Sequence, residues 1–337
     1  MRSNVWFIPC GSHQRIPRTE AERAAIRAEA DAARMLSVEE AASLSRGRER
    51  TISTTPVSAS GALHFTKMHG AGNDYVYVNC FEEKVANPPA LARAVSDRHF
   101  GIGGDGLILI MPSKAADVRM RIFNADGSEA EMCGNGIRCL AKYAYDHGIC
   151  KSREVRVETG AGVKLVTLQV RGGRAAGARV DMGAPDLHRG AIPMRGRPDE
   201  IAVNVPLKAL GKRYLATCVS MGNPHCVIFT RNLDAVPLER IAPVIERMPL
   251  FPRRTNVHFA QVVNRSEIKV RTWERGTGAT LACGTGACAS VVAAATTRRT
   301  GRRVKARVPG GVLMIDWSDS GRVLMTGPAV EVFSGEW

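Results

Sequence analysis

The chain has 337 residues, 45% of them hydrophobic, which is enough for one large or two ordinary domains with a full apolar core. No segment approaches the roughly 18 consecutive apolar residues of a membrane-spanning helix, so we expect no membrane partner. The nine cysteines are an odd number and no secretory signal precedes them, which favours a reducing, cytoplasmic location over a disulfide framework.

The first part of the chain, residues 1–61, differs in composition from the rest. Residues 19–50 are rich in Ala, Glu and Arg and predict partial helix, whereas the Ser, Thr, Pro, Ala and Gly of residues 53–61 are typical of a linker. Seven acidic residues within the first 60 argue against a transit peptide. We therefore expect a poorly ordered N-terminal extension outside the main fold.

From Leu63 onward, short apolar runs separated by turn residues predict strands. The predicted strands cover residues 75–79, 107–111, 155–158, 163–170, 226–229, 256–263, 268–272 and 312–316. Two segments predict helices instead, over 137–147 and 287–299, and each follows a turn of the form Cys-Gly-x-Gly. The two similar turns suggest an internal repeat.

A constant offset of 150 residues supports that repeat. Chance convergence of short glycine motifs explains the two turns, but not their shared spacing to the other matching positions. The pairs at this offset are Asn73 and Asn223, Arg121 and Arg271, Cys133 and Cys283, Gly134 and Gly284, and Gly136 and Gly286. We therefore predict an α+β fold with two pseudo-symmetric domains.

The formal net charge is +15, and part of it is concentrated between residues 298 and 307. The cluster consists of Arg298, Arg299, Arg302, Arg303, Lys305 and Arg307. It suggests either a nucleic-acid surface or a solvated helix end and loop. Aromatic residues make up only 5% of the chain and no nucleic-acid-binding motif accompanies the charge, so we expect no nucleic-acid partner.

The two cysteine turns are the strongest candidates for chemistry. The first amides of a helix have no internal partner and, with the helix dipole, favour an anion. A thiol with an ordinary pKa of about 8.5 becomes more acidic at such a position. We therefore expect Cys133 and Cys283 to be acidic thiols, with a substrate carboxylate bound at the same helix starts.

Two thiols on opposite sides of a ligand suit inversion at carbon, where one removes a proton and the other supplies one to the opposite face. Three alternatives remain at this point. Cys139 and Cys288 can join the first two cysteines as zinc ligands, although both fall inside predicted helices. One cysteine can act as a nucleophile with His225 as its base. Both turns can be purely structural.

Seven motifs, in this order, resemble the diaminopimelate epimerase family. They are KMHGAGNDY at 67–75, FGIGGDG at 100–106, FNADGSE at 123–129, MCGNGIRC at 132–139, MGNPH at 221–225, RTNV at 254–257, and WERGTG at 273–278 followed by ACGTGA at 282–287. The resemblance covers residues 63–337, and residues 1–60 have no counterpart in the usual bacterial form.

The resemblance implies an isomerase that needs neither pyridoxal phosphate nor a metal and interconverts LL- and meso-2,6-diaminopimelate for lysine and peptidoglycan synthesis. It implies two domains, each an antiparallel barrel-like sheet around a central helix, and a homodimer. The first domain would comprise residues 62–182 plus 326–337, and the second residues 183–325. A proline or hydroxyproline racemase is the nearest rival, but that family typically has histidine at the position of Asn135.

The resemblance also assigns roles to individual residues. The catalytic bases would be Cys133 and Cys283, with His225 and Glu274 assisting. The substrate would be held by Asn73, Asn124, Gly134, Asn135, Asn223, Asn256, Glu274, Arg275, Gly284 and Thr285. Some family members have a glutamine where this chain has Gly106, so a contact there would be lost or made by backbone or water.

Overall fold

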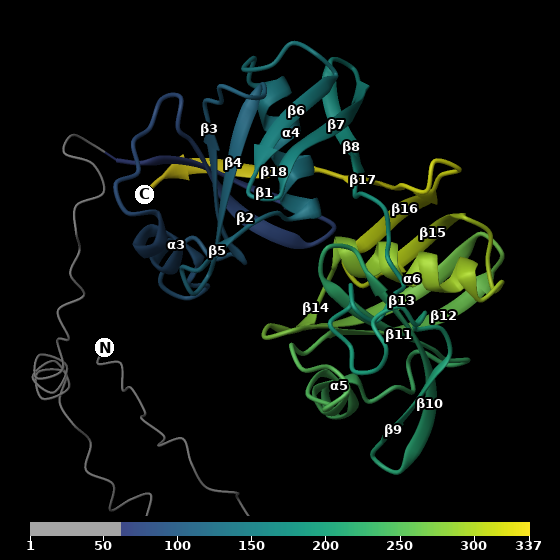
Figure 1. Ribbon diagram of the computed structural model, residues 1–337. Coiled ribbons are helices and arrows are strands. Elements are labelled where there is room, and N and C mark those ends of the chain that lie inside the picture. The colour runs from purple at the N-terminus through teal and green to yellow at the C-terminus, as the bar shows by residue number, and fades with distance from the viewer. Residues whose placement is uncertain (1–61) are drawn as a thin grey trace, which may run out of the picture. The chain divides into compact units, whose positions relative to one another are not determined.

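The computed structural model describes residues 62–337, so the predictions for residues 1–61 lie outside the described residues. The described chain consists of 18 strands and four helices (Figure 1). The elements of the first half are β1 (His64–Gly70), β2 (Asn73–Asn79), α3 (Pro88–Ser96), β3 (Gly106–Met111), β4 (Val118–Asn124), β5 (Glu129–Ala130), α4 (Gly134–Asp146), β6 (Glu154–Thr159), β7 (Gly162–Arg171) and β8 (Arg174–Asp181).

The second half repeats this order of elements, with one additional strand at each end. It contains β9 (Val205–Ala209), β10 (Lys212–Ser220), β11 (Pro224–Phe229), α5 (Leu238–Glu246), β12 (Asn256–Asn264), β13 (Glu267–Glu274), β14 (Gly278–Thr280), α6 (Gly284–Thr296), β15 (Arg303–Val308), β16 (Gly311–Trp317), β17 (Val323–Pro328) and β18 (Val330–Glu336). All eight predicted strands lie within observed ones.

The constant offset found in the sequence holds for whole elements. Helix α5 follows α3, and α6 follows α4, at the same spacing as the two cysteines, and the helices of each pair are identical in length. The pairing pattern is repeated too, because β2 is parallel to β3 as β11 is to β12, and β4 is parallel to β6 as β13 is to β15. The predicted duplication is confirmed.

The predicted α+β fold of two similar halves is confirmed, and most strand pairs are antiparallel, but the sheet is mixed and open. Each half contains two parallel pairs, because the connections through α3 and α4, and through α5 and α6, are long crossovers rather than hairpins. The strand pairings also form one open series, so the sheet does not close into a barrel. Strand β17 pairs with β16 of its own half and with β8 of the first half, and β18 pairs with β1. The two halves therefore share one continuous 18-stranded mixed sheet, which is not closed.

Helices α4 and α6 are buried almost along their full length against the strands of their own halves (Figure 1). Both begin three residues earlier than predicted, because the glycines form the first turn and the cysteine is the N-cap. Helix α6 also ends earlier than predicted, at Thr296, because Arg298 adopts a left-handed conformation with φ 57°. Both central helices thus present a cysteine at their N-terminus.

The basic cluster after α6 has partners within the chain. The guanidinium of Arg299 lies 4.7 Å from the ring centre of Phe229, and that of Arg302 lies 4.4 Å from the ring centre of Trp317. Arg307 pairs with Glu267 at 2.5 Å. These cations therefore pack against the second half. Within residues 62–337, no helix is long and apolar enough to span a membrane.

Candidate active site

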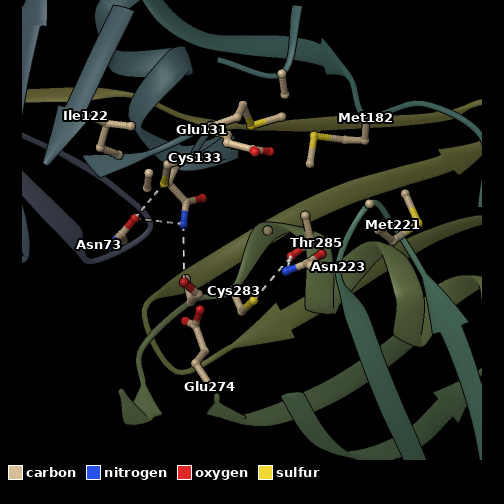
Figure 2. A pocket seen from close by; sticks show the side chains of 18 of the residues that line it. Asn73, Ile122, Glu131, Cys133, Met182, Met221, Asn223, Glu274, Cys283 and Thr285 are labelled. Atoms are coloured by element: carbon tan, nitrogen blue, oxygen red, sulfur yellow. Dashed lines mark hydrogen bonds between the residues drawn. The ribbon is translucent and has the colours of Figure 1, made fainter. Parts of the chain in front are cut away.

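A cavity of about 600 Å³ is lined by residues from both halves. Figure 2 shows Asn73 next to Cys133, and shows Glu274, Thr285 and Asn223 around Cys283. The lining residues are Asn73, Tyr75, Ile122, Asn124, Ala130, Glu131, Met132, Cys133, Gly134, Asn135, Ala161, Lys164, Met182, Ala184, Met221, Gly222, Asn223, Glu274, Arg275, Ala282, Cys283, Gly284 and Thr285. Both cysteine turns therefore open on the same pocket.

Cys133 is the N-cap of α4 and is held by two neighbours. Its Sγ accepts a hydrogen bond from the backbone N–H of Gly136 at 3.4 Å and donates to Asn73 Oδ1 at 3.3 Å. The orientation of the Asn73 amide is fixed because its Nδ2 donates to Asp105 at 2.6 Å. Since a donating sulfur carries a proton, this arrangement favours the thiol form of Cys133.

Cys283 is the N-cap of α6, and only 5% of its surface is exposed. Its Sγ lies 3.6 Å from the hydroxyl oxygen of Thr285. On its other side is Glu274, whose carboxylate accepts a hydrogen bond from Thr280 Oγ1 at 2.6 Å. Burial raises the pKa of Glu274. The two equivalent cysteines thus have different neighbours.

The expected acidity of the two thiols is wrong for this structure. Burial raises the pKa of Cys133, although the amides of Gly136 and Asn135 lower it. The pKa of Cys283 is raised well above the ordinary value, first by burial and then by the charge of Glu274. The helix-start amides act in the predicted direction, but the loss of solvation is the larger effect.

Asn135 connects the two cysteine turns. Its Nδ2 donates to Asn73 Oδ1 and to the carbonyl of Ala282, both at 3.2 Å. Its Oδ1 accepts from Arg138 at 2.9 Å, and the fully buried Arg138 guanidinium also donates to the carbonyl of Gly134 at 2.9 Å. Because Arg138 can only donate, it fixes which end of the Asn135 amide faces the second half.

The chain matches one protein family over most of the residues that the structure describes. The model of the protein family described as diaminopimelate epimerase matches residues 65–188 and 217–332. The diaminopimelate epimerase of Pelotomaculum thermopropionicum is 57% identical over 278 residues, which cover 82% of this chain and 99% of that protein. The diaminopimelate epimerase of Moorella thermoacetica is 55% identical over 277 residues, with the same shares covered.

The chain belongs to the diaminopimelate epimerase family. Solved structures of more distant proteins share its fold. A probable proline racemase of Agrobacterium radiobacter has a TM-score of 0.60 at 18% identity, covering 82% of this chain and 92% of that one. A PhzF-family phenazine biosynthesis protein of Bacillus anthracis has a TM-score of 0.59 at 17% identity, covering 82% and 99%.

Most residues predicted for this epimerase-family site line the cavity, but His225 and Asn256 do not. His225 is fully buried behind Asn223, whose Oδ1 lies 2.8 Å from His225 Nε2. Asn256 is also buried, where its amide donates to the carbonyl of Pro224 at 2.9 Å and accepts from the backbone N–H of Arg275 at 2.9 Å. Both residues therefore support the pocket wall from behind.

Gly106 does not line the cavity either. A Cβ there would collide with the carbonyl of Phe123 and lie 2.9 Å from the Tyr75 ring. A glycine is therefore required by the close approach of β3 and β4.

Sequence reasoning missed several of this family member's lining residues, among them Glu131, Lys164, Met182 and Met221. Glu131 directly precedes the motif at 132–139 and Met221 is the first residue of the motif at 221–225, which is a usable signal. Lys164 is on β7 and Met182 follows β8, where the sequence shows only ordinary strand alternation. Within residues 62–337, no group of three His, Cys, Asp or Glu side chains is placed to hold a metal ion.

Proposed function

We propose that this chain interconverts LL-2,6-diaminopimelate and meso-2,6-diaminopimelate, without pyridoxal phosphate or a metal. The observation that carries the proposal is the pair of cysteine N-caps, one from each half of a duplicated fold, on a single polar pocket. The names of relatives such as the Pelotomaculum enzyme support the choice of substrate.

In this mechanism one sulfur, as thiolate, removes the α-proton while the other, as thiol, delivers a proton to the opposite face. One proton leaves and one arrives, and the reverse reaction exchanges the two roles. Negative charge that develops toward the α-carboxylate would be stabilised by the free amides at the starts of α4 and α6. Because burial raises the pKa of both Cys133 and Cys283, the thiolate has to be generated as substrate binds.

The polar groups of the pocket match a ligand with an amino and a carboxylate group at each end. Arg275 can donate two parallel hydrogen bonds to a carboxylate, and Glu274 can accept from an ammonium group. Asn73, Asn124 and Asn223 can donate or accept without changing the charge of the site. A monoamino acid such as proline would leave part of this set unpaired.

The remaining parts of the proposal follow the family. We propose a cytoplasmic homodimer that serves lysine and peptidoglycan precursor synthesis. Its first domain would comprise residues 62–182 plus 326–337 and its second residues 183–325. The pairing of β18 with β1 supports returning the C-terminal segment to the first domain.

Incubation of LL-diaminopimelate with the protein in D2O tests the proposal. We expect meso product that carries one solvent deuterium at the inverted carbon, without added cofactor. Proline and hydroxyproline are assayed in parallel, because a probable proline racemase and a hydroxyproline epimerase share the fold. Turnover of proline but not of diaminopimelate would contradict the assigned substrate.

Single variants test the two-base mechanism. Cys133→Ala and Cys283→Ala are each expected to abolish epimerisation with the fold retained, because each removes the sulfur that carries the proton on one face of the substrate. Cys139→Ala and Cys288→Ala are the controls, since these cysteines are buried inside α4 and α6 and outside the pocket lining. Full activity in either of the first two variants would exclude that residue as a base.

A further inference from the structure

A row of buried polar side chains lies behind Cys283. His225 Nε2 lies 2.8 Å from Asn223 Oδ1, and His225 Nδ1 lies 2.9 Å from His258 Nε2. His258 Nδ1 lies 3.0 Å from the hydroxyl oxygen of Thr272. At the pocket end, Asn223 Nδ2 donates to Thr285 Oγ1 at 3.4 Å, and this hydroxyl is 3.6 Å from Cys283 Sγ. The row therefore extends without a gap from Thr272 to the sulfur.

Both histidines are fully buried and uncharged. Burial lowers the pKa of His258 to about 3 and, together with the nearby His258 and Arg275, lowers the pKa of His225 well below its ordinary value. A neutral imidazole has one donor and one acceptor nitrogen. Each ring can therefore transmit the direction of a hydrogen bond from one neighbour to the next.

The far end of the row fixes that direction. Thr272 is buried, and among the described residues its hydroxyl has His258 as its hydrogen-bond partner. A buried hydroxyl proton needs an acceptor, so Thr272 donates to His258 Nδ1. His258 must then carry its proton on Nε2 and donate to Nδ1 of His225.

The near end gives the same direction. Because His225 Nδ1 accepts from His258, His225 carries its own proton on Nε2 and donates it to Asn223 Oδ1. The Asn223 amide donates in turn to Thr285. The hydroxyl oxygen of Thr285 is thereby used as an acceptor, and its proton is free to point at Cys283 Sγ. A donor at this sulfur lowers the pKa of Cys283, opposing burial and the charge of Glu274.

The first half lacks this row. At the offset that relates the two halves, His225, His258 and Thr272 correspond to Tyr75, Ile108 and Ile122. Cys133 instead faces the acceptor oxygen of Asn73. The row is thus specific to one of two otherwise equivalent cysteines, and Cys133 serves as an internal reference.

We propose that His258 is a positioning residue for Cys283: with Thr272 and His225 it directs a one-way chain of hydrogen bonds that ends on the sulfur. The proposal rests on the two-cysteine function above. His258 does not line the pocket, and it lies directly beneath Gly286 in the first turn of α6. Its effect on the reaction is therefore indirect.

The test measures the pH dependence of thiol alkylation in the full chain. Iodoacetamide labelling of the Cys283 and Cys133 peptides is followed by mass spectrometry in the wild type, His258→Phe and His258→Gln. Phe keeps a planar ring, somewhat larger than imidazole, that neither donates nor accepts, whereas Gln retains one donor and one acceptor. In His258→Phe we expect labelling of Cys283 near neutral pH to slow roughly three- to ten-fold, which corresponds to one lost hydrogen bond.

In the same variant, labelling of Cys133 should stay within about two-fold of wild type, and His258→Gln should restore most of the Cys283 rate. An unchanged Cys283 rate in folded His258→Phe, or equal slowing of both cysteines, would overturn the proposal. If His258→Phe does not fold, Thr272→Val removes the first donor at nearly constant volume and must slow Cys283 in the same selective way. Alkylation requires no turnover, so a wild type that labels as expected but does not epimerise would refute the proposed function alone.

Discussion

His225 and His258 make the stability of the protein sensitive to acid. Both rings are neutral in the folded state because burial lowers their pKa values, that of His258 to about 3. In the unfolded chain each ring binds a proton below a pH of about 6.5. Unfolding therefore takes up protons below that pH, and the free energy of unfolding falls by up to about 1.4 kcal/mol per pH unit for each ring.

We expect His258→Gln to flatten this dependence by about one proton between pH 6.5 and 5, or roughly 1.4 kcal/mol per pH unit. Urea unfolding of both proteins from pH 7.5 to 5.0 gives the two slopes. His99→Gln, which removes an exposed ring, is the matched control. Equal slopes for wild type and His258→Gln would mean that His258 is protonated in the folded protein.

For the two thiols, position could be predicted from the sequence but the direction of the pKa shift could not. The position of Cys133 and Cys283 at helix starts was predictable from the glycines that follow them. The sign of their pKa shifts was not, because it depends on how much of the surrounding chain removes water from each sulfur. His225 and Asn256 lie in motifs that resemble the family, as many residues that line the cavity also do. Only the packing of their strands shows that these two side chains lie behind the pocket wall.

At the scale of elements, the first turn of α6 is packed too closely to accept a larger residue. A Cβ on Gly286 would overlap the His258 ring and lie 2.8 Å from its Nδ1. The equivalent glycine in α4, Gly136, faces the flexible end of Ile108 instead. The second turn therefore depends more strongly on its glycine.

We expect Gly286→Ala to reduce the epimerase rate at least about ten-fold by displacing His258 and disrupting the chain to Cys283, with the fold retained. Gly301→Ala is the control, because a Cβ there would be 3.6 Å from the carbonyl of Arg265, an ordinary contact. The measurement is kcat with circular dichroism for the fold. A wild-type rate in Gly286→Ala would show that the turn tolerates displacement of His258.

Elements differ in how well the sequence specified them. The starts of α4 and α6 were found to within three residues from the Cys-Gly-x-Gly turns. Helices α3 and α5 were missed because prolines obscure them: α3 begins at Pro88 and Pro89, and α5 contains Pro243. The constant offset between the halves would have located α5 only if α3 had been recognised first.

At the scale of the whole molecule, strand pairing across the halves was not visible in the sequence. Strand β17 pairs with both halves, and β18 then continues to β1, where backbone hydrogen bonds of 2.9 Å also join Leu63 and Trp337. No local pattern distinguishes a strand that links two halves from one that stays within a half. The sequence motifs predicted a return to the first domain through family resemblance alone.

We expect deletion of residues 330–337 to lower the melting temperature and abolish activity, because it removes β18 from β1 and takes away the ring contact of Phe333 with Phe65. Deletion of residues 1–61 is the comparison and should leave activity unchanged, since the cavity is lined by residues 73–285. Thermal melts and the deuterium assay measure both. A shortened chain that ends at 329 and melts like wild type would contradict this role of β18.

The divergence of the duplicated halves has a stereochemical consequence. LL- and meso-diaminopimelate are opposite in configuration at one carbon and identical at the other. In the proposed reaction, a perfectly symmetric pair of half-sites would act equally on both faces of the reacting carbon but would offer the rest of the ligand two equivalent orientations. Asn135 in one turn and Thr285 in the other, with the row of histidines only behind Thr285, break that symmetry. Under the proposed function, this asymmetry lets the site act on both faces of one carbon while it holds the rest of the ligand in a single orientation.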